Sequence, residues 1–137
     1  MPVFLELIVL LGELIGEFKG KNTVYRVLSD GKIETSGQGT GKILGIDAFL
    51  ITTSIGNMSN GVFMGEVNTI ITTMTGETVM LKGNAVGWPS GNGGSTRAAS
   101  IQMTSSEKLM RLNKVLCVHE YETDMTDNWT GKMWEWK

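Results

Sequence analysis

Two short turns that end in glycine constrain the fold of this chain most strongly. Val62 to Met74 and Glu77 to Gly87 form the clearest predicted hairpin of the chain, and Thr75-Gly76 separates the two segments. Asp30-Gly31 divides a second pair of β-like segments in the same way. Alternation with a period of two is typical of half-buried β-strands, and a two-residue turn ending in glycine is typical of a tight hairpin. The sequence therefore predicts antiparallel hairpins closed at these two turns.

The register that a turn imposes predicts which side chains point inward. If Thr75-Gly76 is the whole loop, Asn68 faces Gly83 and Glu66 faces Ala85. Large polar side chains opposite residues with almost no side chain leave empty volume beside them, as a ligand pocket requires. We therefore expect Glu66 and Asn68 to point into a cavity. By the same reasoning the first hairpin places Arg26 opposite Thr35.

Three glycines recur with a period of two at Gly37, Gly39 and Gly41. They fit neither the Walker pattern nor the dinucleotide-binding pattern, because Lys42 and Ile43 stand where those patterns need other residues. Such a row instead leaves one face of a strand bare, as happens where a sheet bends into a barrel or where another group packs against the backbone. We prefer this structural interpretation to a phosphate cradle.

The remaining pattern completes an all-β architecture. Further strands are expected at Ile46–Ile55, Thr96–Met103, Val115–Thr123 and Trp129–Lys137, with polar loops at Gly56–Gly61 and Pro89–Ser95 and a short helix that begins at the capping box Thr104–Glu107. Phe4 to Leu11 fits either a strand or a helix, and we lean towards a strand. About eight sequential strands solve the problem of exposed edges by closing on themselves. The sequence therefore predicts one domain over residues 1–137, an eight-stranded antiparallel β-barrel with one short helix before the last two strands.

Composition excludes several classes of partner. The chain has 137 residues, a formal net charge of -2 and a single cysteine, Cys117. No basic cluster is present to neutralise phosphates, which argues against nucleic acid and against an anionic membrane surface. The apolar segment Val3–Ile15 is interrupted by Glu6 and Glu13 and is too short to span a bilayer. We therefore expect a cytoplasmic protein, with Cys117 as a small buried hydrophobe.

The residues that could carry chemistry are few. His119 is the only histidine, so sites built from paired histidines and a Ser-His-acid arrangement are both weak hypotheses, and no metal or cofactor is expected. Glu66 is the more interesting carboxylate, either as a ligand-binding or acid–base group or as half of a buried Glu–Arg pair. Glu66 and His119 are the weak catalytic candidates. The candidate ligand-binding residues are Tyr25, Arg26, Glu66, Asn68, Arg97 and Trp134.

The chain resembles a known group of barrels at several of these motifs. The motifs are Gly37-Gln38-Gly39-Thr40-Gly41, Thr75-Gly76-Glu77, Gly83–Gly87, Ser106–Asn113 and Gly131–Trp136. Together they are similar to uncharacterised microbial proteins with an allene oxide cyclase-like or dirigent-like β-barrel. The resemblance covers nearly the whole chain from about Gly12, and it implies a cavity for an apolar or phenolic small molecule and association as trimers. The motifs are mostly turn glycines, which specify shape rather than chemistry, so no catalytic residue is carried over.

Three functional hypotheses remain. The first is a non-catalytic barrel that binds a small apolar or aromatic ligand in its interior. The second is a cyclase or isomerase in which Glu66 or His119 moves a proton. The third is a structural protein whose apolar outer strands bury against copies of itself, as a dimer or a trimer.

Overall fold

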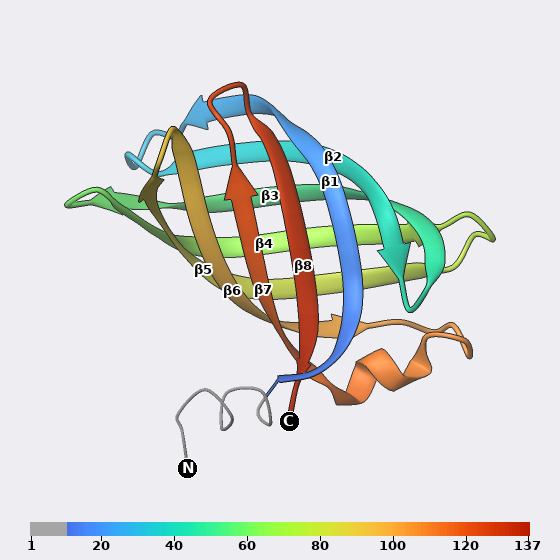
Figure 1. Ribbon diagram of the computed structural model, residues 1–137. Helices are drawn as coiled ribbons and strands as arrows, with labels where there is room; N and C mark the ends of the chain where they lie inside the picture. The colour runs from blue at the N-terminus through green and yellow to red at the C-terminus, as the bar shows by residue number, and fades with distance from the viewer. Residues whose placement is uncertain (1–10) are drawn as a thin grey trace, which may run out of the picture.

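The structure is a computed structural model that describes residues 11–137 and forms a closed antiparallel barrel (Figure 1). Its strands are β1 (Leu11–Val27), β2 (Ile33–Ile43), β3 (Ile46–Ser59), β4 (Val62–Thr73), β5 (Thr78–Ser90), β6 (Gly93–Met103), β7 (Leu116–Thr123) and β8 (Asn128–Trp136), with a 3₁₀ helix η1 (Met110–Lys114) before β7. Each strand pairs with the next, and β1 pairs with β8, so the sheet has no free edge strand. The predicted eight-stranded barrel is confirmed. The strand-or-helix alternative for Phe4 to Leu11 lies outside the described residues, except at Leu11, where β1 begins.

The two glycine turns are one residue longer than the sequence pattern suggests. Thr73 N donates to Glu77 O at 2.9 Å, and Gly76 N donates to Thr73 O at 3.0 Å. Gly76 has φ +92°, and Gly31, at the end of the equivalent β1–β2 loop, has φ +88°. This is the three-residue hairpin loop, in which a type I turn is followed by a residue in the left-handed region. Glycine is favoured there because it has no Cβ.

The longer loop moves the β4–β5 register by one residue. Val67 faces Gly83 and Glu66 faces Asn84. Because side chains alternate between the two faces of a strand, a shift of one residue turns the other set of side chains towards the axis. The expectation that Glu66 and Asn68 point inward is therefore wrong, and both lie exposed on the outer wall. The inward face expected for β5, with Gly83 and Ala85, is retained.

The glycine row of β2 lies on the inner wall, where another group packs against it. A Cβ added to Gly39 would lie 2.8 Å from Trp129 Cη2, and one added to Gly20 in β1 would lie 2.5 Å from Trp129 Cζ2. At Gly41 the added atom would meet the backbone oxygen of Glu17 at 2.0 Å. The bare face is thus occupied by the indole ring of Trp129 and by neighbouring backbone. The structural interpretation of the row is confirmed.

Two expected loops are turns within longer hairpins. β3 continues to Ser59 and turns at Asn60-Gly61, where φ is +54° and +78°. β5 and β6 run to Ser90 and from Gly93, so the segment expected to be a flexible loop from Pro89 to Ser95 is mostly strand. Gly and Ser stay in strand β6 because β5 and β7 pair with its backbone on both sides. The sequence alone does not show this pairing between strands.

The predicted helix is a single 3₁₀ segment that starts later than the capping box. Thr104 Oγ1 accepts a hydrogen bond from Ser106 N at 3.1 Å and donates to Thr78 O at 2.7 Å, so it stabilises a turn and does not cap η1. The side chain of Asn113, in η1, pairs with the backbone N and O of Thr104 at 2.8 and 2.9 Å. These contacts fold the segment back across the end of the barrel.

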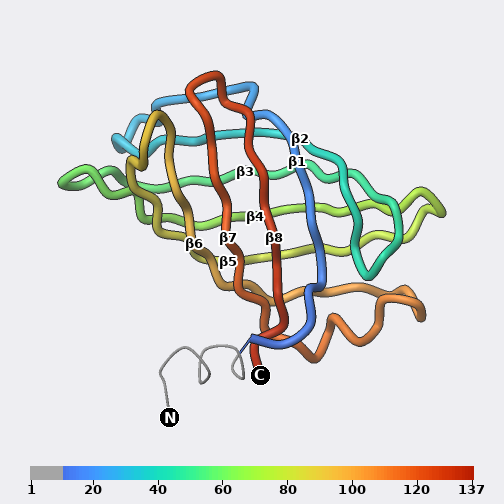
Figure 2. The backbone as a smooth tube through the Cα atoms, in the orientation of Figure 1, coloured from blue at the N-terminus to red at the C-terminus, as the bar shows by residue number. Residues whose placement is uncertain are grey.

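The 3₁₀ helix η1 lies beside one end of the barrel (Figures 1 and 2). The interior is filled with buried side chains in this half of the barrel. Leu109 and Leu112 are fully buried there, and Arg111 bonds to Glu13 of β1 at 2.9 Å and to Glu135 of β8 at 3.2 Å. The buried hydrophobic residues are Ile15, Phe18, Ile43, Ala48, Leu50, Ile71, Val79, Leu81, Leu109, Leu112, Cys117, Trp129 and Met133. Cys117 is buried, as expected. Within residues 11–137, no helix has the length and apolar character needed to cross a membrane.

The outer wall of β3 to β6 carries a row of exposed apolar side chains. Ile51 pairs with Ile70, Ile70 with Met80, and Met80 with Met103, one from each strand. All four are exposed, from 36% for Met80 to 57% for Ile51. We call these four residues the outer apolar row. Glu66 and Lys82 are the charged residues of β4 and β5 on the same wall.

Candidate functional site

A cavity of ≈ 120 Å³ lies in the half of the barrel away from η1. Every strand except β5 contributes a side chain to it, and on β5 the facing positions are Gly83 and Ala85. The lining residues are Asn22, Thr35, Leu50, Thr52, Ser54, Val67, Thr69, Thr96, Tyr121, Thr123 and Trp129. None of them is charged, and most carry a hydroxyl group. The cavity therefore carries no charge, and its wall combines apolar surface with hydroxyl groups.

Most of the hydroxyl groups in this cavity have no partner among the described side chains. Thr52 Oγ1 and Thr69 Oγ1 bond to each other at 2.8 Å. In contrast, the hydroxyls of Thr35, Ser54, Thr96 and Thr123 make no side-chain hydrogen bond in residues 11–137, so each is available to a small molecule or to water. Because a hydroxyl both donates and accepts, these groups adapt to either polarity of guest.

Trp129 is the cavity residue whose polar group lacks a hydrogen-bond partner. The residue is 6% exposed, and its Nε1–H is the one buried side-chain polar group of residues 11–137 that has no hydrogen-bond partner. Its ring packs at 83° to that of Tyr121, with the ring centres 5.9 Å apart. Native interiors satisfy nearly all of their buried polar groups, so an orphaned donor beside a cavity calls for an acceptor.

His119 lies deeper in the barrel, in a chain of hydrogen bonds that starts at the backbone of η1 and the residue after it. Gln102 Nε2 donates to the carbonyl oxygens of Leu112 and Val115 at 3.3 and 3.0 Å. Its Oε1 lies 2.5 Å from Ser100 Oγ, which lies 2.6 Å from His119 Nε2. The other ring nitrogen, Nδ1, lies 3.1 Å from the hydroxyl of Tyr121, which lines the cavity. The chain therefore joins η1 to the cavity wall.

These contacts determine where each proton sits. Carbonyl oxygens only accept, so the amide nitrogen of Gln102 must face Leu112 and Val115, and its oxygen must face Ser100. Ser100 then donates its one proton to Gln102 and accepts from His119 Nε2–H. Nδ1 is left unprotonated and accepts from Tyr121. His119 is thus neutral, with both nitrogens engaged, and it does not take a proton from Ser100.

Burial moves the pKa values of the inward titratable groups away from pH 7. Desolvation lowers the pKa of His119 to about 4, and it raises the pKa of Tyr121 to about 12. Desolvation also raises the pKa of the Cys117 thiol to about 11. A general acid or base works best with a pKa near the operating pH. The arrangement around His119 therefore suits a rigid wall better than proton transfer.

Most of the residues expected to bind a ligand lie outside the barrel. Arg26 pairs with Glu34 at 3.0 Å on the outer surface. Arg97 pairs with Glu122 at 3.2 Å, and its guanidinium carbon lies 5.5 Å from the ring centre of Trp88. For these two arginines, as for Glu66 and Asn68, an inward orientation is wrong. The proposed buried Glu–Arg pair is absent from the described interior, because Glu66 is exposed.

Tyr25 and Trp134 differ from the expectation in other ways. Tyr25 faces Thr35 of the cavity wall across the β1–β2 pair, but it is 54% exposed at the rim, and its hydroxyl donates to Asp127. Desolvation, followed by this contact with Asp127, raises the pKa of Tyr25. Trp134 pairs with Val118 on the outer face of β8, and the tryptophan that walls the cavity is Trp129. Of the expected site residues, only His119 is buried inside the barrel.

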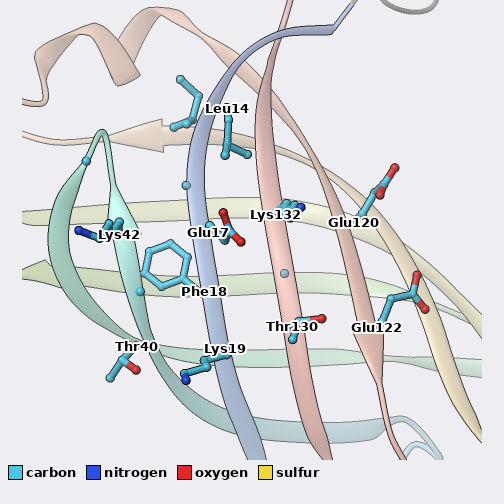
Figure 3. Close-up of a pocket in the computed structure, with 15 residues that line it drawn as sticks. Leu14, Glu17, Phe18, Lys19, Thr40, Lys42, Glu120, Glu122, Thr130 and Lys132 are labelled. Carbon is cyan, nitrogen blue, oxygen red and sulfur yellow. The ribbon is translucent and has the colours of Figure 1, made fainter.

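A larger hollow of ≈ 660 Å³ lies along β1, between β2 and β8 (Figure 3). Glu17 faces Lys42 on one side and Lys132 on the other, and Lys132 also faces Glu120. The carboxylates and ammonium groups alternate across these strands, so their charges balance. Side chains of this kind are solvated, and the hollow offers no excess charge with which to hold an ion.

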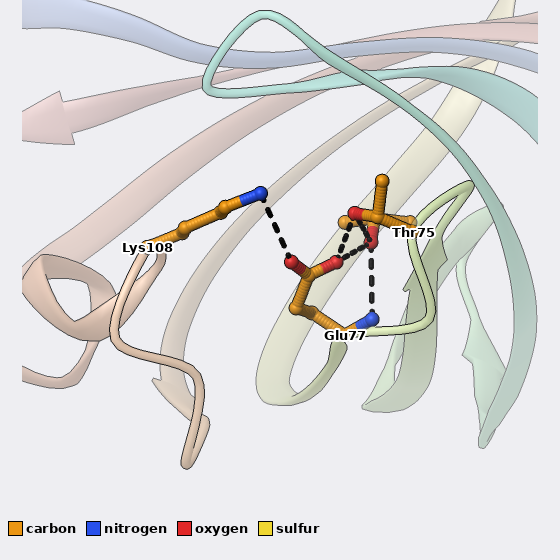
Figure 4. A network of polar contacts seen from close by, with 4 residues as sticks. Thr75, Glu77 and Lys108 are labelled. Atoms are coloured by element: carbon orange, nitrogen blue, oxygen red, sulfur yellow. Dashed lines mark hydrogen bonds and ion pairs between the residues drawn. The ribbon is translucent and has the colours of Figure 1, made fainter.

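A polar cluster joins the segment before η1 to the β4–β5 loop (Figure 4). Thr73 and Thr75 both donate their hydroxyl protons to Glu77 Oε2, and Lys108 Nζ lies 3.6 Å from Glu77 Oε1. The hydrogen bond from Thr73 is the main cause that lowers the pKa of Glu77 to about 2, and the bond from Thr75 adds to it. The cluster stabilises the closed end of the barrel and lies far from the cavity residues in the fold.

Sequence reasoning missed the hydroxyl-rich wall. The signal was present in β3 and β4, where Thr52, Ser54 and Thr69 share the inner face with apolar residues. Threonine is common on both faces of β-strands, so its periodicity carries little weight without a secure register. The correct loop length would have placed these side chains, and not Glu66, on the inside.

The fold and this interior define a small closed β-barrel that is filled at one end and hollow at the other. No protein-family model matches the chain, and no curated protein matches its sequence.

Solved structures of other barrels share the fold. A conserved protein of unknown function from Rhodopseudomonas palustris superimposes with a TM-score of 0.76 at 11% identity, over 91% of this chain and 96% of that one. A protein of unknown function from Clostridium acetobutylicum gives 0.72 at 11% identity, over 91% and 98%. A β-barrel-like protein from Acinetobacter baumannii gives 0.71 at 14% identity, over 93% and 95%. The chain is thus similar to uncharacterised β-barrel proteins, and at these identities the likeness concerns the fold alone.

Proposed function

We propose that the barrel binds a small uncharged molecule in the cavity beside Trp129. The observation that carries the proposal is a neutral cavity of ≈ 120 Å³ whose walls present hydroxyl groups without protein partners. An apolar cavity of about 150 Å³ holds benzene, so this one suits a guest of about six non-hydrogen atoms. A charged guest is disfavoured because no wall residue would compensate its desolvation. The resemblance to allene oxide cyclase-like and dirigent-like barrels, which implies a cavity for an apolar or phenolic small molecule, is in line with a small uncharged guest.

Binding is favoured over the cyclase or isomerase alternative by the position of the two proposed proton carriers. Glu66 is exposed on the outer wall, and His119 is neutral with both nitrogens engaged. Neither is placed to move a proton on a molecule in the cavity. The chemistry that the cavity supports is enclosure and hydrogen bonding.

A cavity-filling variant with a matched control tests the proposal. Ser54→Leu fills the cavity from β3, whereas Thr53→Leu changes the neighbouring residue on the outer face of the same strand. A thermal-shift and native mass spectrometry screen with neutral cyclic compounds at millimolar concentration should find a guest that stabilises the wild-type protein and Thr53→Leu but not Ser54→Leu. At ten times its Kd such a guest adds about 1.4 kcal/mol. Failure of every neutral compound of this size, or equal stabilisation of Ser54→Leu, would refute the proposal.

A specific observation also favours self-association, and we propose that two copies meet through the outer apolar row. Contiguous exposed apolar surface is typical of an interaction site. Lys82 lies next to Met80 on the outer face of β5, and Glu66 lies beyond Asn68 on β4, opposite Asn84. A two-fold axis parallel to the strands, between β4 and β5, places Glu66 of one copy over Asn84 of the other, two positions along β5 from Lys82. The charges beside the row are therefore complementary to themselves under a dimer's symmetry.

The dimer is tested by sedimentation at micromolar concentrations. The wild-type protein should sediment as a dimer, and Ile70→Lys, at the centre of the row, should sediment as a monomer. Thr130→Lys introduces the same charge on the outer face of β8, away from β3 to β6, and serves as the control. A wild-type protein that sediments as a monomer at micromolar concentrations would contradict the proposal, as would an Ile70→Lys variant that sediments as a dimer.

A further inference from the structure

The hydrogen-bonding groups around Trp129 narrow the class of guest. This inference rests on the proposed function and concerns the same cavity. An indole Nε1–H donates and cannot accept. It is buried without an acceptor, in a residue that lines a cavity whose unpartnered hydroxyl groups can act in either role.

We infer that the cavity selects uncharged molecules that carry a hydrogen-bond acceptor, such as a ring ketone, lactone or cyclic ether, and that Trp129 Nε1–H donates to that acceptor. The two requirements come from different residues. Neutrality follows from walls without charge, and the acceptor follows from the orphaned donor of Trp129. A hydrocarbon of equal size leaves the donor unmet, and a cation adds a second donor where an acceptor is needed.

The edge of Tyr121 helps to set where such a guest lies. Its ring stands at 83° to Trp129, and its hydroxyl proton is already donated to His119 Nδ1. The Tyr121 oxygen therefore only accepts from a guest. Trp129 is left as the aromatic residue of the cavity whose proton is free, which makes it the group that distinguishes a ketone from an alkane.

Three probes of six non-hydrogen atoms separate these possibilities: cyclopentanone as the acceptor, methylcyclopentane as the apolar isostere and cyclopentylamine as the cation. Cyclopentanone should bind the wild-type protein about tenfold more tightly than methylcyclopentane, the size of effect that one hydrogen bond to a buried donor gives. Cyclopentylamine should bind at least tenfold more weakly than cyclopentanone.

Two tryptophan variants assign the effect. Trp129→Phe removes the donor and keeps a ring, and it should abolish the preference for the ketone. Trp134→Phe makes the same change on the outer face of the same strand and should leave the preference intact. In the ¹H–¹⁵N spectrum, the indole signal that is absent from Trp129→Phe should move when cyclopentanone is added and stay in place with methylcyclopentane.

The outcomes distinguish this inference from the proposal beneath it. If none of the three probes binds, the proposed function itself fails. If ketone and hydrocarbon bind equally to the wild-type protein and to Trp129→Phe, the cavity binds neutral molecules but the acceptor inference is overturned. The acceptor inference is also overturned if cavity signals shift with cyclopentanone while the Trp129 indole signal does not, since a resident water would then satisfy the donor.

Discussion

Lowering the pH from 7 to 5 should destabilise the barrel through His119 before any carboxylate contributes. The imidazole is buried and neutral, and its pKa lies near 4 in the folded protein against 6.5 in its ordinary state. The unfolded chain therefore binds the proton more tightly than the folded one. The contribution of His119 to stability is complete above pH 6.5 and is lost as the pH falls from 6.5 towards 4.

The size of the effect follows from the two pKa values. At pH 5 the unfolded imidazole is almost fully protonated, whereas about one folded molecule in ten is, and the difference amounts to about 2 kcal/mol. For a domain of this length that corresponds to a fall in Tm of roughly 6–10 °C. Among residues 11–137, the neighbours of His119 across β6 and β8 are Ala98 and Met133, and neither carries a charge that would offset this loss.

Urea unfolding at a series of pH values, for the wild-type protein and for His119→Gln, provides the test. The variant cannot titrate, and its amide nitrogen still donates towards Ser100. It should be less stable at pH 7 but should lose little further stability down to pH 5. If both proteins lose the same free energy over this range, the argument from burial fails. An imidazole that titrates near 6.5 would refute the argument from burial. An imidazole that carries its proton on Nδ1 would refute the hydrogen-bond assignment.

Three other changes test the closed end, the inner wall and the acidic cluster. Leu112→Ala, at a fully buried cap position, should cost about 2–5 kcal/mol in denaturant unfolding, and a loss below 1 kcal/mol would mean that η1 does not seal the barrel. Gly39→Ala puts a Cβ 2.6 Å from the backbone oxygen of Lys19 and should cost about 1–3 kcal/mol, whereas an unchanged Tm would argue against the close packing of β1 on β2. Glu77 has a depressed pKa, so its contribution is present above about pH 4.5 and is lost as the pH falls towards 2. Glu77→Gln should flatten the stability profile in that range, and an unaltered acid profile would contradict the cluster in Figure 4.

The architecture was predictable because it follows from local patterns. Period-two alternation, glycine turns and the absence of repeated helical segments suffice for an antiparallel barrel of about eight strands. The register was not predictable from the same signals. Thr75-Gly76 is compatible with a two-residue and a three-residue loop, because both place glycine at a left-handed position before the next strand. The one-residue difference turned Glu66 outward and reversed the inner face expected for β4.

The site was harder to predict because it depends on contacts between distant strands. His119 was named from the sequence as a weak catalytic candidate, but Ser100 and Gln102, which hold it in a chain of hydrogen bonds, lie 19 and 17 positions away and carry no motif. The importance of Trp129 follows from its packing against Gly20 and Gly39, on two other strands. A single sequence shows an aromatic residue in a strand and does not show which wall it faces.

The seal that η1 makes at one end separates the part of the barrel that maintains the fold from the part that meets a guest. Substitutions in the hollow half can alter recognition while the plugged half retains the structure. Diversification should therefore be tolerated best on the inner faces near the β1–β2 and β7–β8 turns, which makes this end of the molecule the natural place to engineer new specificities.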